Sequence, residues 1–330
     1  MLSGGEKIFM ALASGEFLLG FVVNGFIALV NCIDRVKRKK LPPSDLILVS
    51  LAISRIGLSC TIVWESYLIV TSINVPTQVR MIDIFLVLTH GTHMWFATVL
   101  SIFYFLKITN FSNPFFLWMK RRIDRMLFML LMRPFIIYFS IAFPMMQTMY
   151  FYHSGLFSRG KERNVSEEVH VSNSIFFMLQ VLFSVLSLIP FILSITSFSL
   201  FILSLWKHIR QMQLNATGQR DPSTEAHVGA MKAVSSFIIL FLLYYVGFYV
   251  NYLTKEKSKL ASMLCVSIML FYSFGHSVIL ILSNSKLRKA ALRVSWLMRF
   301  CQRGCHLQAL WVPLRIIWHF LGRKKSHWSP

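Results

Sequence analysis

The sequence predicts an all-α membrane protein, a seven-transmembrane helix bundle with the N-terminus outside and the C-terminus in the cytoplasm. Three observations predict this fold class: seven long apolar stretches, few charged residues, and a one-sided distribution of basic residues. Of the 330 residues, 55% are hydrophobic and 14% are charged, whereas average soluble domains carry about 25% charged residues. A soluble domain of this size could not bury so much apolar surface, but lipid-facing helices can expose it.

Each apolar stretch is long enough to cross the hydrocarbon core of a bilayer, which takes roughly 20 mostly apolar residues. The predicted spans cover about 8–33, 44–70, 81–106, 126–151, 174–206, 234–252 and 260–283. The connections between them are too short for a soluble domain. We therefore expect one membrane domain over residues 1–295 and a basic cytoplasmic tail over residues 296–330.

The basic residues indicate the orientation, because cytoplasmic loops carry an excess of Lys and Arg. With the N-terminus outside, 24 of the 34 basic residues fall in the predicted inner segments and 8 in the outer ones. The inner segments are 34–43, 107–125, 207–232 and 284–330. The formal net charge of +21 therefore reflects topology, and we expect no binding of nucleic acid.

The second predicted outer segment, residues 152–173, carries the glycosylation sequon Asn164-Val165-Ser166. We expect Asn164 to be glycosylated. Two other sequons, which begin at Asn110 and Asn215, fall on the predicted inner side and should remain unused. No pair of cysteines lies in the predicted outer segments, so we expect no extracellular disulfide framework.

Arg55 is an informative residue because it lies in the middle of the second predicted span. An arginine there costs about 2.5–3.5 kcal/mol on insertion scales, so it should face the bundle and find acceptors. At about 1.5 Å per residue, Arg55 and Asn24 lie roughly 16 and 14 Å from the inner boundary. We therefore predict a polar lock, with a hydrogen bond between Asn24 and Arg55. The lock either only joins the helices or also takes part in switching between states.

Trp95 and Tyr244 are two aromatic residues at mid-depth, each roughly 16 Å from the inner face. Their rings are amphipathic, with an apolar body and a polar tip. Such residues, placed away from the interfacial belts, can line a cavity between helices. Ordinary helix packing is the alternative interpretation.

His90 and His93 lie one helical turn apart, but no acidic or cysteine partner is close to them in sequence. We therefore predict no metal site and no cofactor, and expect these residues to pack between helices or to line a polar pocket. No phosphate-binding loop, serine-hydrolase elbow or zinc-protease motif is present, so an enzyme is not expected. Neither inverted halves nor interrupted spans indicate a transporter. A receptor remains, with a small ligand-gated channel or a transporter-like seven-span protein as the alternative.

Several sequence blocks resemble the type 2 taste receptors, the bitter-taste G-protein-coupled receptors. The blocks occur in the expected order and cover about residues 1–295. They are NGFIALVNCID (24–34), LAISRI (51–56), WFAT (95–98), LSIFYFLKI (100–108), SLWKH (204–208), RDPSTEAH (220–227), HS (276–277) and NSKL (284–287).

The resemblance implies a plasma-membrane receptor that binds small bitter compounds between its helices and activates a gustducin-type G protein. It implies that Trp95, Val99 and Tyr244 contact the ligand. Val266 also matches a pocket position, where relatives can carry an acidic residue.

The predicted inner loops, 107–125 and 207–232, are where the G protein would bind. The candidate contact residues are Lys107, His208, Arg220 and Lys232. The sequence leaves a homo-oligomer open.

The tail after residue 296 differs from the short polar ending of that family. Within residues 307–325, five apolar residues repeat at mostly three- or four-residue spacing, which places them on one helical face. Basic residues nearby would favour the anionic inner leaflet. We predict an amphipathic segment on membrane lipid, with Cys301 and Cys305 as candidate palmitoylation sites. A tail without this structure is the alternative.

Overall fold

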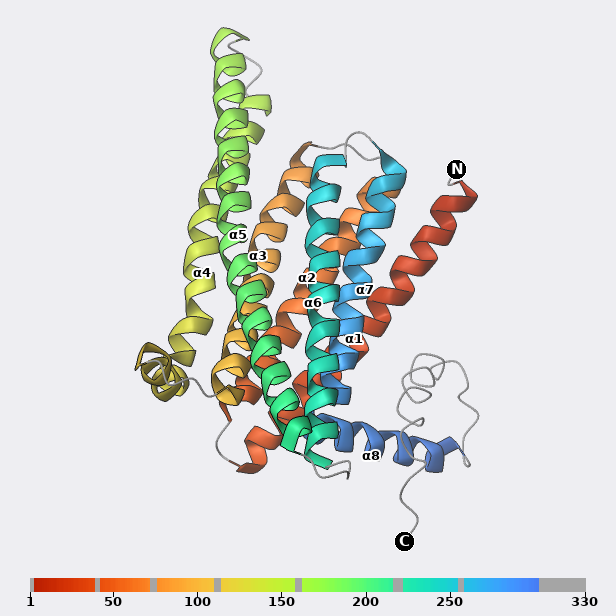
Figure 1. Ribbon diagram of the computed structural model, residues 1–330. Coiled ribbons are helices and arrows are strands. Elements are labelled where there is room, and N and C mark those ends of the chain that lie inside the picture. Colours follow the sequence, from red (N-terminus) through yellow and green to blue (C-terminus); the bar gives the residue numbers. More distant parts are fainter. Residues whose placement is uncertain are drawn as a thin grey trace.

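The computed structural model describes residues 3–38, 42–71, 76–109, 114–157, 162–215, 222–254 and 258–302. Within these ranges the only regular secondary structure is α-helix, in eight elements (Figure 1). They are α1 (Gly4–Arg38), α2 (Pro43–Thr71), α3 (Pro76–Ile108), α4 (Pro114–Phe157), α5 (Glu162–Asn215), α6 (Pro222–Thr254), α7 (Lys259–Ser283) and α8 (Ser285–Gln302).

The structure confirms the predicted all-α bundle of seven spans, because seven of the described helices are long and apolar enough to cross a membrane. Most of the apolar segments agree with the predicted spans to within a few residues. The fourth starts earlier than predicted, at Phe116.

The helices themselves extend past the apolar segments. Most of the segment predicted as an outer loop, 152–173, continues α4 and α5. Apolarity locates only the part of a helix that lies in lipid, while backbone hydrogen bonding continues into the polar flanks.

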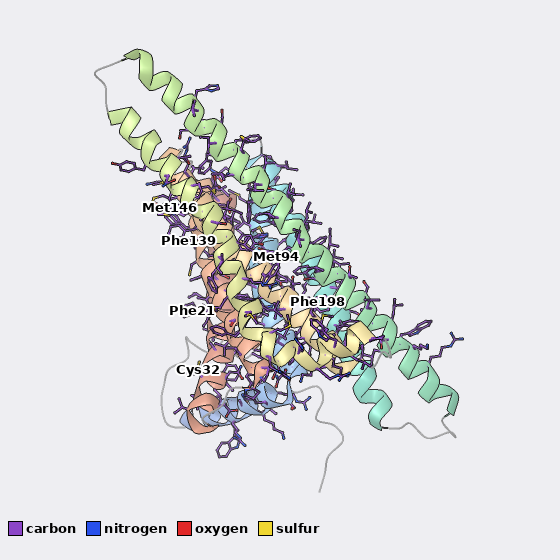
Figure 2. The ribbon with its side chains drawn as sticks, turned by 90° about the vertical axis from the view of Figure 1, so that its left-hand side faces the viewer. Phe21, Cys32, Met94, Phe139, Met146 and Phe198 are labelled. Carbon is purple, nitrogen blue, oxygen red and sulfur yellow. The ribbon has the colours of Figure 1, made fainter. Side chains whose placement is uncertain are left out.

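The helix α3 forms the centre of the bundle, and α5 lies at its periphery. Within the most apolar 18-residue stretch of each helix, 72% of the residues are buried in α3 but only 22% in α5. On α4, Phe139 is 58% exposed and Met146 52%, whereas Met94 of α3 is fully buried (Figure 2). The exposed apolar faces of α4 and α5 are suited to contact with lipid tails.

Two contacts fix the position of α3 against its neighbours. A Cβ atom added to Gly91 would lie 2.5 Å from the ring of Tyr138, so only glycine allows α4 to approach this closely. On the other side, the Thr98 hydroxyl lies 2.8 Å from the Pro190 carbonyl oxygen and 2.7 Å from the Ser194 hydroxyl of α5. Such interhelical hydrogen bonds and small residues are typical of membrane bundles.

The eighth helix lies across the end of the bundle that is opposite the N-terminus (Figure 1). Between α7 and α8, Asn284 adopts an extended backbone conformation. The Asn284 side-chain oxygen accepts hydrogen bonds from the backbone N–H groups of Lys286, at 3.0 Å, and Leu287, at 3.3 Å. Asn284 thus caps the start of α8, because these N–H groups have no partner within the helix.

Candidate functional site

A buried histidine–tyrosine pair joins α3 to α6. His90 Nδ1 lies 2.6 Å from the Tyr244 hydroxyl, and neither residue is exposed. The His90 ring stacks between Tyr244 and Phe248, with ring centroids 5.6 and 3.7 Å away. An imidazole buried in an apolar bundle needs a hydrogen-bond partner, and Tyr244 supplies it.

A second set of polar rings continues from this pair toward α7. His93 Nε2 lies 3.2 Å from the Tyr272 hydroxyl, which lies 3.2 Å from His276 Nδ1. The rings of Tyr244 and Tyr272 are 4.6 Å apart between centroids. Residues from α3, α6 and α7 therefore form one buried cluster of histidine and tyrosine side chains.

Arg55 of α2 extends this cluster to α1. Its Nη1 donates to the Ser277 hydroxyl at 2.8 Å, and its Nη2 contacts His276 Nδ1. The Ser277 hydroxyl in turn donates to Asn24 Oδ1 at 2.7 Å. The predicted residues thus belong to one network, but the direct hydrogen bond expected between Asn24 and Arg55 is replaced by a bridge through Ser277.

The donor and acceptor roles in this network follow from Arg55. A guanidinium only donates, so His276 Nδ1 must be the acceptor and its proton sits on Nε2. Arg55 then uses the single lone pair of that nitrogen, and the Tyr272 hydroxyl lies 3.2 Å from both His276 Nδ1 and His93 Nε2. The Tyr272 hydroxyl therefore lies between His93 and His276 in one buried polar series. No acidic partner for Arg55 occurs among the described side chains.

The four residues that the resemblance placed at a ligand pocket do not all meet. Tyr244 and Val266 are fully buried in the core, and Val99 is nearly so. Trp95 instead points to α4, where its indole N–H donates to the Leu130 carbonyl oxygen at 2.9 Å. Val99 follows Trp95 by one helical turn on that side of α3. Sequence reasoning placed Trp95 and Tyr244 at one depth but missed that His90 is the α3 residue beside Tyr244.

The α4 surface carries an apolar hollow that is separate from this cluster. Its volume is about 560 Å³, and all its lining residues come from α4. They are Phe135, Ile136, Phe139, Ser140 and Phe143. Because these residues are largely exposed and face outward, we assign the hollow to the lipid-facing surface.

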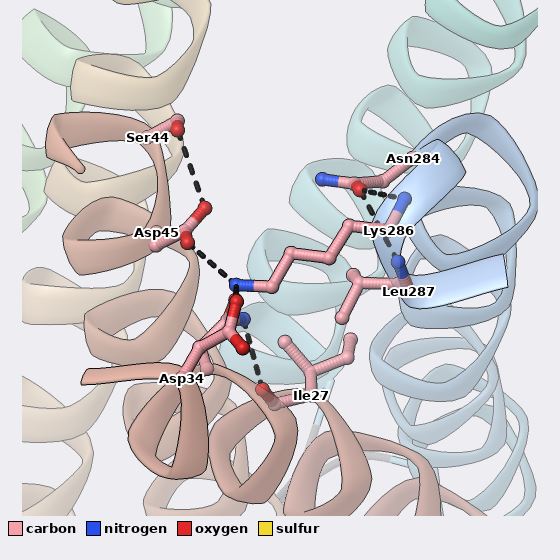
Figure 3. Close-up of polar contacts among 8 residues, drawn as sticks. Ile27, Asp34, Ser44, Asp45, Asn284, Lys286 and Leu287 are labelled. Carbon is pink, nitrogen blue, oxygen red and sulfur yellow. Dashed lines mark hydrogen bonds and ion pairs between the residues drawn. The ribbon is translucent and has the colours of Figure 1, made fainter. Parts of the chain in front are cut away.

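A charged cluster at the opposite end joins α8 to α1 and α2 (Figure 3). Lys286 Nζ lies 2.8 Å from Asp34 Oδ2, 2.6 Å from Asp45 Oδ2 and 2.8 Å from Asn31 Oδ1. Partial burial disfavours the ammonium, but the hydrogen bonds and charges of Asp34 and Asp45 outweigh it and raise the pKa of Lys286. Lys286 therefore remains charged at neutral pH and holds α8 against the bundle.

The other predicted surface residues are described only in part. Lys107 is exposed and pairs with Asp124 at 3.0 Å. Asn164 and His208 lie within α5, Lys232 within α6 and Cys301 within α8, but their side chains are outside the described set. Arg220, Cys305 and the predicted amphipathic segment 307–325 are outside the described residues.

Comparisons with known proteins agree with this arrangement. A family model described as "Taste receptor protein (TAS2R)" matches residues 1–299. Taste receptor type 2 member 7 of Macaca mulatta is 44% identical over 309 residues, which cover 92% of this chain and 97% of the relative. Taste receptor type 2 member 8 of Pongo pygmaeus is 42% identical over 303 residues, with 89% and 97% coverage. The similarity includes all seven apolar helices.

Proposed function

The chain belongs to the type 2 taste receptor family and is a bitter-taste G-protein-coupled receptor of the plasma membrane, and we propose that agonists bind beside the His90–Tyr244 pair and activate a gustducin-type G protein. The observation that carries this proposal is the buried network between that pair and Arg55. It runs through α3, α6, α7, α2 and α1. A ligand that displaces Tyr244 would act directly on helices that must rearrange.

The proposed orientation places the N-terminus outside and α8 at the cytoplasmic face. In this orientation the basic residues of 107–125 and 207–232 lie inside, and Asn164 lies outside. Replacing Asn164 by Gln should remove an endoglycosidase-sensitive mass from the expressed receptor. An unchanged mass would contradict the outer location of Asn164 or its use.

The proposed agonist site lies in the outer half of the bundle, with Tyr244 and Val266 in its wall. Trp95 and Val99 also belong to the proposed site. They lie on the side of α3 that faces α4, where they set how closely α4 packs against α3. A ligand shifts a receptor between states only by its differential affinity for them. We propose that agonists favour a state in which α5 and α6 separate at the cytoplasmic end, where Lys107, His208, Arg220 and Lys232 would meet the G protein.

Calcium signalling in cells that express the receptor with a gustducin-containing Gα chimera tests the proposal. Some bitter compounds should evoke a response, and cells without the chimera should give none. Tyr244→Phe, which removes the hydroxyl beside His90, should change agonist potency while the receptor still reaches the surface. An agonist-evoked current without any Gα subunit would favour the channel alternative instead.

A further inference from the structure

An arginine lies on the lipid-facing side of α4. Arg133 is exposed, whereas its neighbour Pro134 is buried against the bundle. Arg133 also falls within Phe116–Tyr150, the apolar segment of α4 that can cross the membrane. A cation among lipid tails is expensive, and charged residues at such depth almost always face the bundle interior or pair with another group. Arg133 therefore needs a partner on the outer surface of the bundle.

The described part of the protein supplies no such partner. None of the hydrogen bonds, ion pairs or ring contacts of the described residues involves Arg133. Asp124 is the only acidic residue in the sequence of α4, and it pairs with Lys107 at 3.0 Å. The apolar segment of α5, His170–Lys207, contains no acidic residue. An acceptor for Arg133 must therefore come from the lipid around the receptor.

Two contacts with α3 fix which face of α4 is turned outward. Pro134 has no N–H group, so the Leu130 carbonyl oxygen, four residues earlier, loses its helical donor. The Trp95 indole N–H of α3 replaces that donor at 2.9 Å. One helical turn after Pro134, the buried ring of Tyr138 packs closely against α3. These contacts keep Arg133 on the outer face.

The apolar hollow on α4 begins one helical turn from Arg133. Ile136 and Ser140 line it, and they follow Arg133 by three and seven residues, which places all three on one helix face. The volume of the hollow, about 560 Å³, lies within the range of about 300–1,000 Å³ for ligand sites. Because residues of a single helix line it, the hollow suits a flexible chain that lies along the helix.

Arg133 and the hollow are arranged in the order of a headgroup and an acyl chain. In the proposed orientation α4 runs outward, so Arg133 lies on the cytoplasmic side of the hollow. Helix side chains lean toward the N-terminus of their helix, so the guanidinium should extend toward the inner headgroups. The inner leaflet carries anionic lipids, and the planar guanidinium can bind a phosphate through two parallel hydrogen bonds.

We propose that Arg133 and the hollow bind one phospholipid with an anionic headgroup from the inner leaflet. The guanidinium donates to the phosphate, and an acyl chain lies in the hollow against Ile136, Phe139 and Phe143. A second copy of the chain fits this face less well, because α4 beyond Asp124 and the apolar segment of α5 offer no carboxylate to Arg133. The choice of leaflet rests on the proposed orientation.

Native mass spectrometry of the full-length receptor tests the site. The receptor is titrated in micelles with dioleoyl phosphatidic acid or dioleoyl phosphatidylcholine, and the parent should retain one phosphatidic acid molecule in preference to phosphatidylcholine. Arg133→Gln should lower the affinity for phosphatidic acid by about 10- to 100-fold, the range of a charge-assisted hydrogen bond. Arg133→Lys keeps the charge but not the paired hydrogen bonds, so its loss should be smaller.

Matched variants separate this site from general attraction to anionic lipid. Arg210→Gln removes another exposed cation, beyond the apolar segment of α5, and should lower the affinity by no more than about fivefold, the contribution of one surface cation. Ser140→Trp fills the hollow but keeps Arg133, and it should also weaken binding. Thr196→Trp should leave binding unchanged, although it likewise replaces an exposed hydroxyl that bonds to its own helix.

Losses in both Arg133→Gln and Ser140→Trp, larger than those in their controls, support the site. Equal retention of the two lipids by the parent overturns it, as does a loss in Arg133→Gln no larger than that in Arg210→Gln, or an unaffected Ser140→Trp receptor. A lipid-free dimer that Ser140→Trp separates would assign the face to a second copy and overturn it as well. If Arg133→Gln does not give a folded receptor, Ser140→Trp compared with Thr196→Trp decides.

Discussion

Replacing Ser277 by Ala should show how much the central network stabilises the bundle. The Ser277 hydroxyl accepts from Arg55 Nη1 and donates to Asn24 Oδ1, and alanine removes only this oxygen. Arg55 is 0% exposed and Asn24 1%, so water cannot replace the lost partner. The substitution leaves one buried donor and one buried acceptor unsatisfied.

The size of the expected destabilisation follows from the two buried groups that lose a partner, Arg55 Nη1 and Asn24 Oδ1. Each unsatisfied buried polar group costs about 1–3 kcal/mol, whereas hydrogen bonds measured within a membrane protein contribute about 0.6 kcal/mol on average. Arg55 is charged and Asn24 keeps only its bond to Gly20 and a long contact with Ser273, so the larger figure applies. We expect a loss of about 2–4 kcal/mol in the free energy of unfolding.

The assay is the apparent melting temperature of the detergent-solubilised receptor. At about 2 °C per kcal/mol for a chain of this size, Ser277→Ala should melt about 4–8 °C below the parent. Ser277→Thr keeps the hydroxyl, so its melting temperature should lie close to that of the parent. Ser295→Ala, which removes an exposed hydroxyl of α8, is the control for a change without burial.

A double-mutant cycle tests the bridge itself. If Ser277 connects the two residues, Asn24→Leu and Ser277→Ala should cost less together than the sum of their separate effects. Arg55→Leu should be more damaging still, with poor surface delivery and no signalling, because Ser277 and His276 both lose their contact with the guanidinium. A Ser277→Ala receptor that melts within about 1 °C of the parent would refute a stabilising bridge through Ser277.

Two further predictions concern the contacts between helices. Gly91→Ala should separate α3 from α4, because the added methyl group would meet the Tyr138 ring at 2.5 Å. We expect a loss of about 1–3 kcal/mol in the free energy of unfolding, measured as a lower melting temperature. The double variant Gly91→Ala/Tyr138→Leu should partly restore the melting temperature, and no recovery would contradict a steric cause. Lys286→Gln should lower the melting temperature and change basal signalling, since Asp34 and Asp45 would lose the ammonium that both contact, whereas Lys289→Gln on the exposed side of α8 should have no effect. The pKa of Lys286 is higher in the folded receptor than in the unfolded chain, where it is about 10.4. The stabilisation by its ion pairs is therefore fully present below the unfolded-state pKa and is lost only as the pH rises through the folded-state pKa. The difference between Lys286→Gln and the parent should therefore not change between about pH 6 and pH 9, and a marked change in that window would contradict the ion-pair assignment.

The sequence alone determined the class of fold and most of the span limits. Hydropathy is a local property, so each apolar stretch reports its own membrane crossing. Depth within the membrane also followed from counting residues, which brought Arg55 and Asn24 to one level. The residue blocks shared with the type 2 taste receptors carried the function, because those blocks are specific to that family.

Only the tertiary structure decided which side chains meet. Counting gives the height of a residue along its helix but not the rotation of that helix about its axis, which depends on packing against neighbours. For this reason Trp95, at the depth of Tyr244, contacts α4, and His90 takes the place beside Tyr244. The partners of Arg55, Ser277 and His276, lie 222 and 221 residues along the chain, and no local pattern indicates them. The hydrogen bond from Asn251 of α6 to Glu65 of α2 likewise joins residues 186 positions apart in the chain, and no local pattern indicates it.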